Sequence, residues 1–293
     1  MREFRHFLAI DWSGAKGERQ KGIALALADT TGGPPTLIRR EKPWSREEVL
    51  HFLRDDLPPE TLVGMDLGIA LPYADAGAYF PGWEASPPDM QALWELVDRT
   101  CEDDPNLECG SFLAHPQAAR YFRHAGGEVG DLFHLDNAPT RQGRFRYAEY
   151  AQKAHGVRPV SNFNLVGAAQ VGKSTLTGMR LLHRLRGSLA VWPVDPLPPS
   201  GSVLVEIYSS IAARSGGVGG TRSKLRNFAE LNQALAQLGS PPVAGTGAID
   251  DHSSDALLTA AWLRKVAHDP AYWNPVDLTP DLARTEGWTF GVL

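Results

Sequence analysis

The stretch RHFLAIDWSG, residues 5–14, begins with a run of apolar residues and ends at an aspartate, a tryptophan and a turn. A short apolar run bounded by turn-forming residues is typical of a buried β-strand. A turn-rich, charged connection (13–20) leads to a second apolar run, KGIALALAD (21–29). We therefore predict a hairpin of two strands, with Asp11 at the end of the first.

Further strands and helices follow this hairpin. PPTLIRRE (34–41) indicates a third strand, and SREEVLHFLRDDL (45–57) indicates a helix with a Ser45–Glu48 capping box. The apolar run TLVGMDLGIALP (61–72) suits a strand in a sheet covered on both faces. The remaining predictions are a helix at 175–187, a fifth strand in SGSVLVEIYSS (200–210), and helices at 223–239 and 250–269. This order predicts an α/β fold with a mixed five-stranded sheet and flanking helices.

Residues 73–165 differ from the rest in being rich in proline, glycine, aromatic and charged residues. Short helices are predicted there, in PPDMQALWELVDRT (87–100) and HPQAARYFRHAG (115–126). Because so many aromatic side chains need burial, we interpret the segment as a large insertion between strands four and five. The whole chain, 1–293, is then predicted to be one domain.

Composition narrows the functional classes. The 293 residues carry a formal charge of −5, so a nucleic-acid partner would need local basic patches. Two cysteines give no disulfide framework. The N-terminus does not have the pattern of a signal peptide, and no apolar run approaches the roughly 20 residues of a membrane helix. We expect a cytoplasmic protein with no membrane contact; the oligomeric state is not predicted.

Acidic residues occur where strands and a helix are predicted to begin or end. Asp11 and Asp66 end strands, Glu206 lies within one, and Asp251 and Asp255 lie four apart on a helix, with His252 between them. Two carboxylates ~4 Å apart repel by about 4 kcal/mol at an effective dielectric constant of ~20. A shared cluster would need cations, and oxygen ligands favour magnesium or manganese. The alternative is that the acids cap turns and helices, as an Asp250–Asp251 pair often does.

Residues Gly167-Ala168-Ala169-Gln170-Val171-Gly172-Lys173-Ser174 match the phosphate-binding pattern G-x-x-x-x-G-K-[ST]. The helix that follows has Leu176, Met179, Leu182 and Leu185 on one face and Gly187 as its stop. The preceding segment RPVSNFNLV (158–166) is a poor buried strand because three polar residues lie close together. A P-loop nucleotide-binding protein is therefore an alternative interpretation.

Four segments resemble a family of predicted RNase H-like nucleases: FLAIDWSGAKG (7–17), LVGMDLGIALP (62–72), LVEIYSSIA (204–212) and DDHSSDALLTAAW (250–262). The resemblance implies an RNase H-like fold and places Asp11, Asp66, Glu206 and Asp255 at the family's acidic positions. His252-x-x-Asp255-Ala256 matches its H-x-x-D-A variant. The Walker-like loop and its helix resemble a glycine-rich element of the family. Ser209 departs from the proline that family members often have after the tyrosine.

Together these observations predict a nuclease that uses magnesium or manganese to hydrolyse the phosphodiester bonds of DNA or RNA. The predicted catalytic residues are Asp11, Asp66, Glu206, His252 and Asp255. The predicted metal ligands are Asp11, Asp66, Glu206, Asp251 and Asp255. The predicted substrate-binding residues, from basic segments and the Walker-like loop, are Lys16, Lys173, Ser174, Arg222 and Lys224.

Two further points stay open at this stage. The basic segment 141–158 carries Arg141, Arg144, Arg146, Lys153 and Arg158, and it interleaves them with Phe145, Tyr147 and Tyr150. Such a mixture suits contact with a nucleic-acid backbone and stacking on bases, although a charged run is usually a solvated face. A catalytically silent nucleic-acid-binding module is the other alternative to the nuclease.

Overall fold

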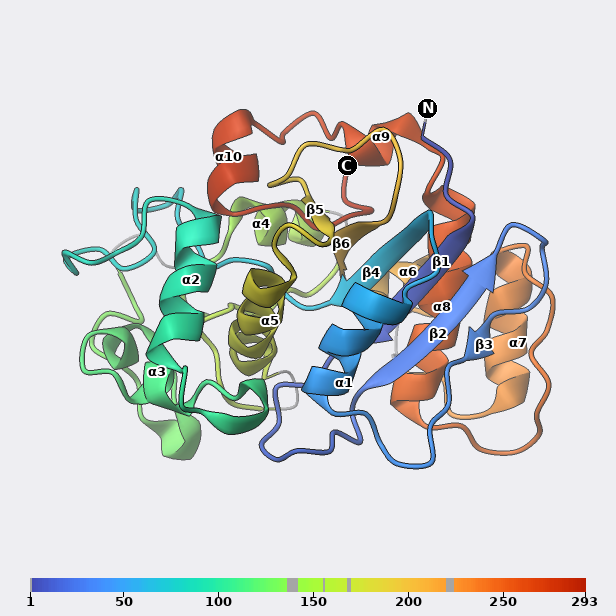
Figure 1. Cartoon of the computed structure of the whole chain (residues 1–293), viewed down its shortest axis with the longest axis horizontal. Helices are drawn as coiled ribbons and strands as arrows, with labels where there is room; N and C mark the ends of the chain where they lie inside the picture. Colours follow the sequence, from blue (N-terminus) through green and yellow to red (C-terminus); the bar gives the residue numbers. More distant parts are fainter. Residues whose placement is uncertain (1, 136–141, 155, 168–169, 220–223) are drawn as a thin grey trace.

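The computed structural model describes residues 2–135, 142–154, 156–167, 170–219 and 224–293. Its centre is a sheet of six strands in the order β3-β2-β1-β4-β6-β5 (Figure 1). The strands are β1 (His6–Asp11), β2 (Ala24–Asp29), β3 (Thr36–Leu37), β4 (Thr61–Asp66), β5 (Ala190–Trp192) and β6 (Val203–Ile207). The mixed α/β class is confirmed. The predicted number of five strands is wrong, because the three-residue β5 was too short to leave a pattern in the sequence.

Strand directions follow from the connections between strands. β1, β2 and β3 follow one another in the chain without an intervening helix and pair antiparallel. β1 pairs parallel with β4, β4 pairs parallel with β6, and β6 pairs parallel with β5. Parallel neighbours need a crossover, and helices lie in the connections from β1 to β4 and from β4 to β6, whereas residues 193–202 between β5 and β6 form no helix. The carboxyl ends of β1, β4 and β6 therefore meet at one edge of the sheet.

Helices flank the sheet. The α-helices are α1 (Arg46–His51), α2 (Met90–Thr100), α3 (Gly110–Ala114), α4 (Tyr147–Ala154), α5 (Val171–Leu185), α6 (Ser209–Ser215), α7 (Phe228–Gln237), α8 (Asp251–Val266), α9 (Pro270–Trp273) and α10 (Pro280–Thr285). A π-helical turn, η1 (Phe52–Asp56), extends α1, and three 3-10 turns are η2 (Pro105–Leu107), η3 (Ala118–Tyr121) and η4 (Ala125–Gly127). The helix predicted at 115–126 is thus two 3-10 turns, and the second contains Gly126 and Gly127 at positive φ values of 84° and 88°.

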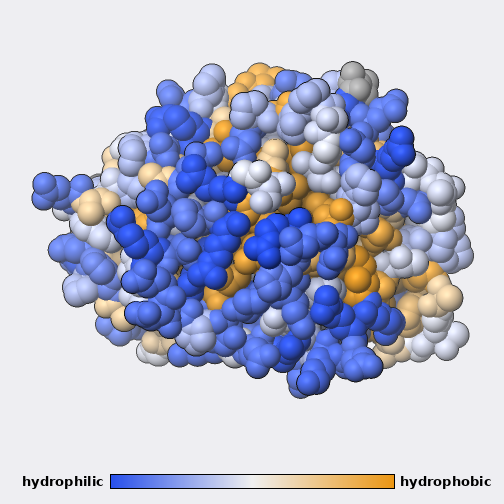
Figure 2. Space-filling model, in the orientation of Figure 1, coloured by the Kyte–Doolittle hydropathy of each residue, from blue (hydrophilic) through white to orange (hydrophobic). Residues whose placement is uncertain are grey.

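The two faces of the sheet bury separate apolar clusters. One cluster joins Leu8, Met65 and Leu204 of the strands to α1, α2 and α5. The other joins Phe7, Leu62 and Val205 to α6, α7 and α8. Figure 1 shows α1 in front of β4, and α8 behind β1 and β2. On the face drawn in Figure 2, hydrophilic residues cover most of the surface and hydrophobic ones gather near its centre.

Local sequence explains why the key helices begin and end where they do. Ser45 accepts a bond from the Glu48 N–H and the Glu48 side chain accepts one from Ser45, so the predicted capping box is confirmed. The apolar face predicted for α5 is fully buried, from Leu176 to Leu185, and Gly187 follows with a φ of 81°. α8 crosses β4 at Gly64, where a Cβ would lie 2.8 Å from Leu263, so glycine permits this close approach.

Candidate active site at the carboxyl edge of the sheet

The strand register places two aspartates side by side. Asp11 ends β1, Asp66 ends β4, and the two are direct partners in the parallel ladder. Partners in adjacent strands point to the same face of a sheet, because side chains alternate with a period of two. The face is that of α8, since Phe7 and Ala9 of β1 pack into the α8 cluster. Two carboxylates are therefore held close together by backbone hydrogen bonding alone.

A third aspartate comes from the start of α8. Asp250 is the N-cap of this helix and accepts a hydrogen bond from the Ser253 N–H at 2.8 Å. The alternative that the Asp250–Asp251 pair caps the helix is therefore correct for Asp250. Asp255 lies in the first turns of α8 and faces the same cavity as Asp11 and Asp66. The cavity has a volume of about 310 Å³. It lies at the lower end of the size range of small-molecule sites.

Burial and mutual repulsion disfavour the charged forms of these aspartates. Burial and the neighbouring charge of Asp11 raise the pKa of Asp66 to about 7. The same two causes raise the pKa of Asp255 to about 7. Burial also raises the pKa of Asp11, against the opposing effect of its bond to His252. A group of carboxyls with raised pKa values in a cleft is typical of functional sites.

Two basic side chains, His252 and Lys224, lie at the rim of the cavity. His252 Nδ1 lies 2.7 Å from Asp11 Oδ2, and this hydrogen bond raises the pKa of the imidazole. The His252 side chain is 47% exposed, so it reaches both the acidic group and solvent. Lys224 forms an ion pair with Asp251 on the same side. Asp251 thus lines the cavity, but its carboxylate is shared with a lysine.

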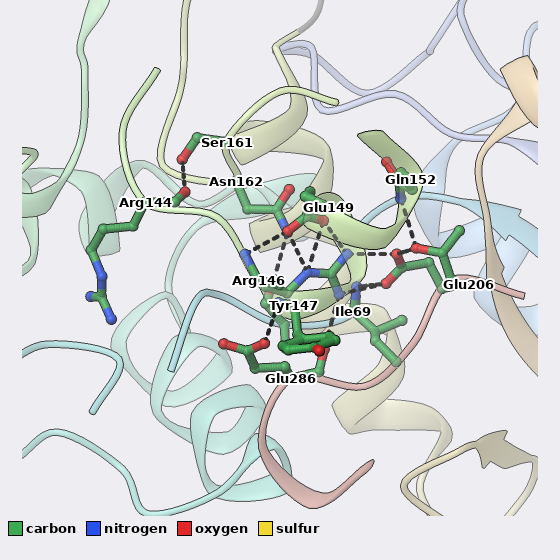
Figure 3. A network of polar contacts seen from close by, with 12 residues as sticks. Ile69, Arg144, Arg146, Tyr147, Glu149, Gln152, Ser161, Asn162, Glu206 and Glu286 are labelled. Carbon is green, nitrogen blue, oxygen red and sulfur yellow. Dashed lines mark hydrogen bonds and ion pairs between the residues drawn. The ribbon is translucent and has the colours of Figure 1, made fainter. Parts of the chain in front are cut away.

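Glu206 lines the cavity from the opposite face of the sheet. Its partner in the β4–β6 ladder is Met65, whereas Asp66 pairs with Ile207. Because side chains alternate, Glu206 points away from the face that carries Asp11 and Asp66. Its carboxylate accepts hydrogen bonds from both terminal nitrogens of Arg146, at 2.7 and 2.6 Å. The side chains of Glu206 and Arg146 are almost fully buried. Figure 3 shows the Arg146 guanidinium between Glu206 and Glu149.

The predicted substrate-binding residues are not all in one place. Ser174 and Lys224 line the cavity, together with Gln170 at the start of α5. Lys16 and Lys173 are not among the residues that line it. The β-carbon of Lys173 instead faces Gly14, and its charge acts on the buried thiol of Cys109. Arg222 lies outside the described residues.

The Walker-like loop lacks the structural context of a P-loop over its described part. A P-loop connects a strand directly to a helix. Residues 158–166 contain no strand beyond an isolated bridge between Asn164 and Arg123, and α5 starts at Val171. Ala168 and Ala169 lie outside the described residues. The lysine that should reach phosphates points elsewhere, so the geometry gives the P-loop interpretation no support.

Two of the basic residues proposed to contact nucleic acid have a different place. Arg144 is fully buried and pairs with Asp75 at 2.5 Å. Arg146 is 1% exposed and pairs with Glu149 and Glu206. Neither guanidinium reaches solvent, so neither can contact a nucleic-acid backbone. The sequence pattern did not show this, because the acidic partners Asp75 and Glu206 lie about 70 and 60 positions away. Tyr147 and Tyr150 are exposed, at 43% and 42%.

Sequence reasoning missed several polar residues of the cavity. The missed lining residues are Glu149, Gln152, Asn162, Gln170, Tyr208 and Ser209, while Arg146 was interpreted only as part of a basic segment. Burial raises the pKa of Glu149 to about 7 although Arg146 opposes the shift. Most of these residues come from 146–170, which joins the site only through tertiary packing. Tyr208 and Ser209 lie two and three positions after Glu206 in the sequence, and that proximity was the one available signal.

The chemistry of the three aspartates suits a hard divalent cation, since all their donors are carboxylate oxygens. In the described part of the chain, no group of three or more histidine, cysteine, aspartate or glutamate side chains is already gathered around a single point. Asp11 is turned toward His252, and Asp66 Oδ2 accepts a bond from the Ser209 N–H at 3.2 Å. Cation binding would therefore require these carboxylates to turn inward.

No helix among the described residues is long and apolar enough to cross a membrane. Comparison of the chain with protein-family models, with curated proteins and with solved structures gave no match.

Proposed function

We propose that this protein is a nuclease with an RNase H-like fold that needs a divalent cation to hydrolyse phosphodiester bonds. The observation that carries the proposal is the convergence of Asp11, Asp66 and Asp255, from three separate elements, on one cavity. Their repulsion costs stability in the absence of a counter-charge. Strongly perturbed carboxyls in a cleft are typical of functional sites, and a divalent cation bound by carboxylate oxygens would remove this repulsion.

The mixed sheet and the helices on both of its faces are compatible with the proposed fold. In the proposal, Asp11, Asp66 and Asp255 would hold magnesium or manganese, and the chemistry such an ion would supply is neutralisation of phosphate charge and a lowered pKa of water. The pKa values near 7 of Asp66 and Asp255 mean that cation binding at neutral pH displaces protons.

The other residues of the cavity would bind substrate and move protons. With Nδ1 of His252 bonded to Asp11, Nε2 is the nitrogen that can accept or donate a proton at the rim. Ser174, Gln170 and Ser209 line the cavity with hydroxyl and amide groups that suit phosphate oxygens. Nucleic acid is proposed as the substrate on the strength of the family resemblance and these polar groups.

A cleavage assay with matched variants tests the proposal. End-labelled single-stranded DNA, double-stranded DNA, single-stranded RNA and an RNA–DNA hybrid are incubated with the protein and Mg²⁺ or Mn²⁺. We expect cleavage of at least one substrate, and a loss of at least about a thousandfold in Asp66→Asn, because several kcal/mol of charge stabilisation are removed. Asp29→Asn, at the far end of β2, is the control and should retain full activity.

Each other outcome points to one alternative. Binding of nucleic acid without cleavage in any divalent cation would favour the silent binding module. Nucleotide binding that is lost in Lys173→Ala would favour the phosphate-binding interpretation. Cleavage by Asp66→Asn at the rate of the unchanged protein would overturn the proposed site.

A further inference from the structure

Glu206 stands apart from the three aspartates because its carboxylate already has a complete set of hydrogen-bond donors. Oε1 accepts bonds from Arg146 Nη2 at 2.6 Å and from the Thr289 hydroxyl at 2.5 Å. Oε2 accepts bonds from Arg146 Nη1 at 2.7 Å and from the Ile69 N–H at 2.8 Å. With two donors on each oxygen and 2% exposure, the carboxylate can offer an oxygen to a cation only if hydrogen bonds to that oxygen break.

The hydrogen-bond donors of the Arg146 guanidinium are also fully used. Nε donates to Glu149 at 3.0 Å, Nη1 donates to Glu206 and to the Glu286 carbonyl, and Nη2 donates to Glu149 and Glu206. These contacts use all five N–H groups of the arginine. Figure 3 shows this group enclosed by its partners. It therefore acts at the cavity as a fixed positive charge and not as a donor to substrate.

Strand register makes the separation of Glu206 from the aspartates a property of the backbone. Glu206 pairs with Met65, so it lies on the α5 face, while Asp66 lies on the α8 face. A change of rotamer cannot bring a side chain through the sheet. A shift of the β4–β6 ladder by one residue would be needed, and it would move every core residue of β6 to the wrong face.

We propose that Arg146 takes the place of a second cation in this site, so that the protein binds a single divalent ion at Asp11, Asp66 and Asp255 and none at Glu206. This inference rests on the proposed function. It assigns Arg146 and Glu206 as positioning residues: the fixed pair ties the start of α4 to β6 and gives the Glu206 carboxylate a permanent positive partner. Two-metal sites hold their ions ~3.5–4 Å apart between shared carboxylates, and here the carboxylate on the second side is already neutralised.

Manganese titration of the full chain tests the inference. Calorimetry of the unchanged protein should give a stoichiometry of one, and the bound Mn²⁺ should give the electron paramagnetic resonance spectrum of an isolated ion. Glu206→Gln should weaken Mn²⁺ binding by less than about tenfold, and Asp66→Asn by about a hundredfold or more, since ligands matter at least as much as the groups that support them. Circular dichroism verifies that both variants fold.

The outcomes separate this inference from the proposed function. A stoichiometry of two with a spin-coupled pair, or equal losses of affinity in Glu206→Gln and Asp66→Asn, would overturn the single-ion inference and leave the nuclease proposal standing. If Glu206→Gln does not fold, the stoichiometry and spectrum of the unchanged protein decide alone. Absence of Mn²⁺ binding in the unchanged protein would overturn the proposed function and the inference with it.

Discussion

Asp66 and Asp255 each release their proton only near pH 7, although an unfolded aspartate does so near pH 4. Between these two values the folded chain binds more protons than the unfolded chain, so raising the pH favours unfolding. We predict that the melting temperature of the metal-free protein falls as the pH rises from 5 to 8, and that Mn²⁺ reverses much of the fall at pH 8. Calorimetric scans with and without Mn²⁺ measure this. A melting temperature that rises steadily over the same range would contradict the pKa shifts.

Asp66→Asn removes one of the mutually repelling charges and keeps an oxygen to accept the bond from the Ser209 N–H. We expect the free energy of unfolding of the metal-free protein at pH 8 to increase by about 1–3 kcal/mol, because each pKa unit corresponds to about 1.4 kcal/mol. Asp29→Asn is the control. Its hydrogen bond with Thr31 lowers the pKa of Asp29, so this change should not stabilise. Equal effects of the two substitutions in urea unfolding would argue against repulsion at the site.

At the scale of elements, the loop that follows β1 packs directly on the first turn of α5. A Cβ at Gly14 would lie 2.4 Å from the backbone of Lys173 and Ser174. We predict that Gly14→Ala lowers the free energy of unfolding by about 1–3 kcal/mol, the usual cost of overpacking. Gly33→Ala, whose added Cβ would meet only the Thr31 hydroxyl at 3.7 Å, should change it little. Similar urea midpoints for both variants would contradict this close packing.

The sequence predicted elements whose signals are local. The Ser45–Glu48 capping box and the apolar face of α5 depend on residues three or four positions apart, and the structure confirms both. β5 was missed because three residues are too few to show a period. The hairpin and the strand that carries Glu206 were found, because each strand is five or six residues long and mostly apolar.

Strand register could not be predicted from the sequence. Which residue of β4 pairs with Glu206 depends on how two strands align, and a shift by one residue reverses the face. The sequence therefore identified the acidic residues of the cavity without showing that Asp11 and Asp66 share a face and that Glu206 lies on the other. The ion pair between Arg146 and Glu206 could not be predicted either, because only tertiary structure brings the two residues together.

At the scale of the whole molecule, one buried network connects the C-terminal segment to the site. The Thr289 hydroxyl donates to Glu206 at 2.5 Å and accepts from Gln152 Nε2 at 2.8 Å, so it links the segment to β6 and α4. The Phe290 N–H also donates to the Glu206 carbonyl at 2.8 Å. The C-terminal segment thus holds Glu206 and Gln152, two residues that line the cavity, in place.

Thr289→Val keeps the shape of this side chain and removes its hydroxyl. We predict a loss of about 2–3 kcal/mol in the free energy of unfolding, because a hydrogen bond to a charged group is lost and a buried amide loses its acceptor. Thr36→Val, on the exposed strand β3, should change the free energy by less than about 0.5 kcal/mol. Guanidinium denaturation compares the two, and equal changes would show that the network does not stabilise the fold.

Crystals of the protein grown with Mn²⁺ and measured near the manganese absorption edge would locate any bound ion directly. We predict one anomalous peak within about 2.0–2.6 Å of carboxylate oxygens of Asp11, Asp66 and Asp255, the range of oxygen ligands around hard cations. Glu206 should stay bonded to Arg146, as in Figure 3. A well-ordered structure with no manganese at the three aspartates would contradict the proposal that this cavity holds a divalent cation.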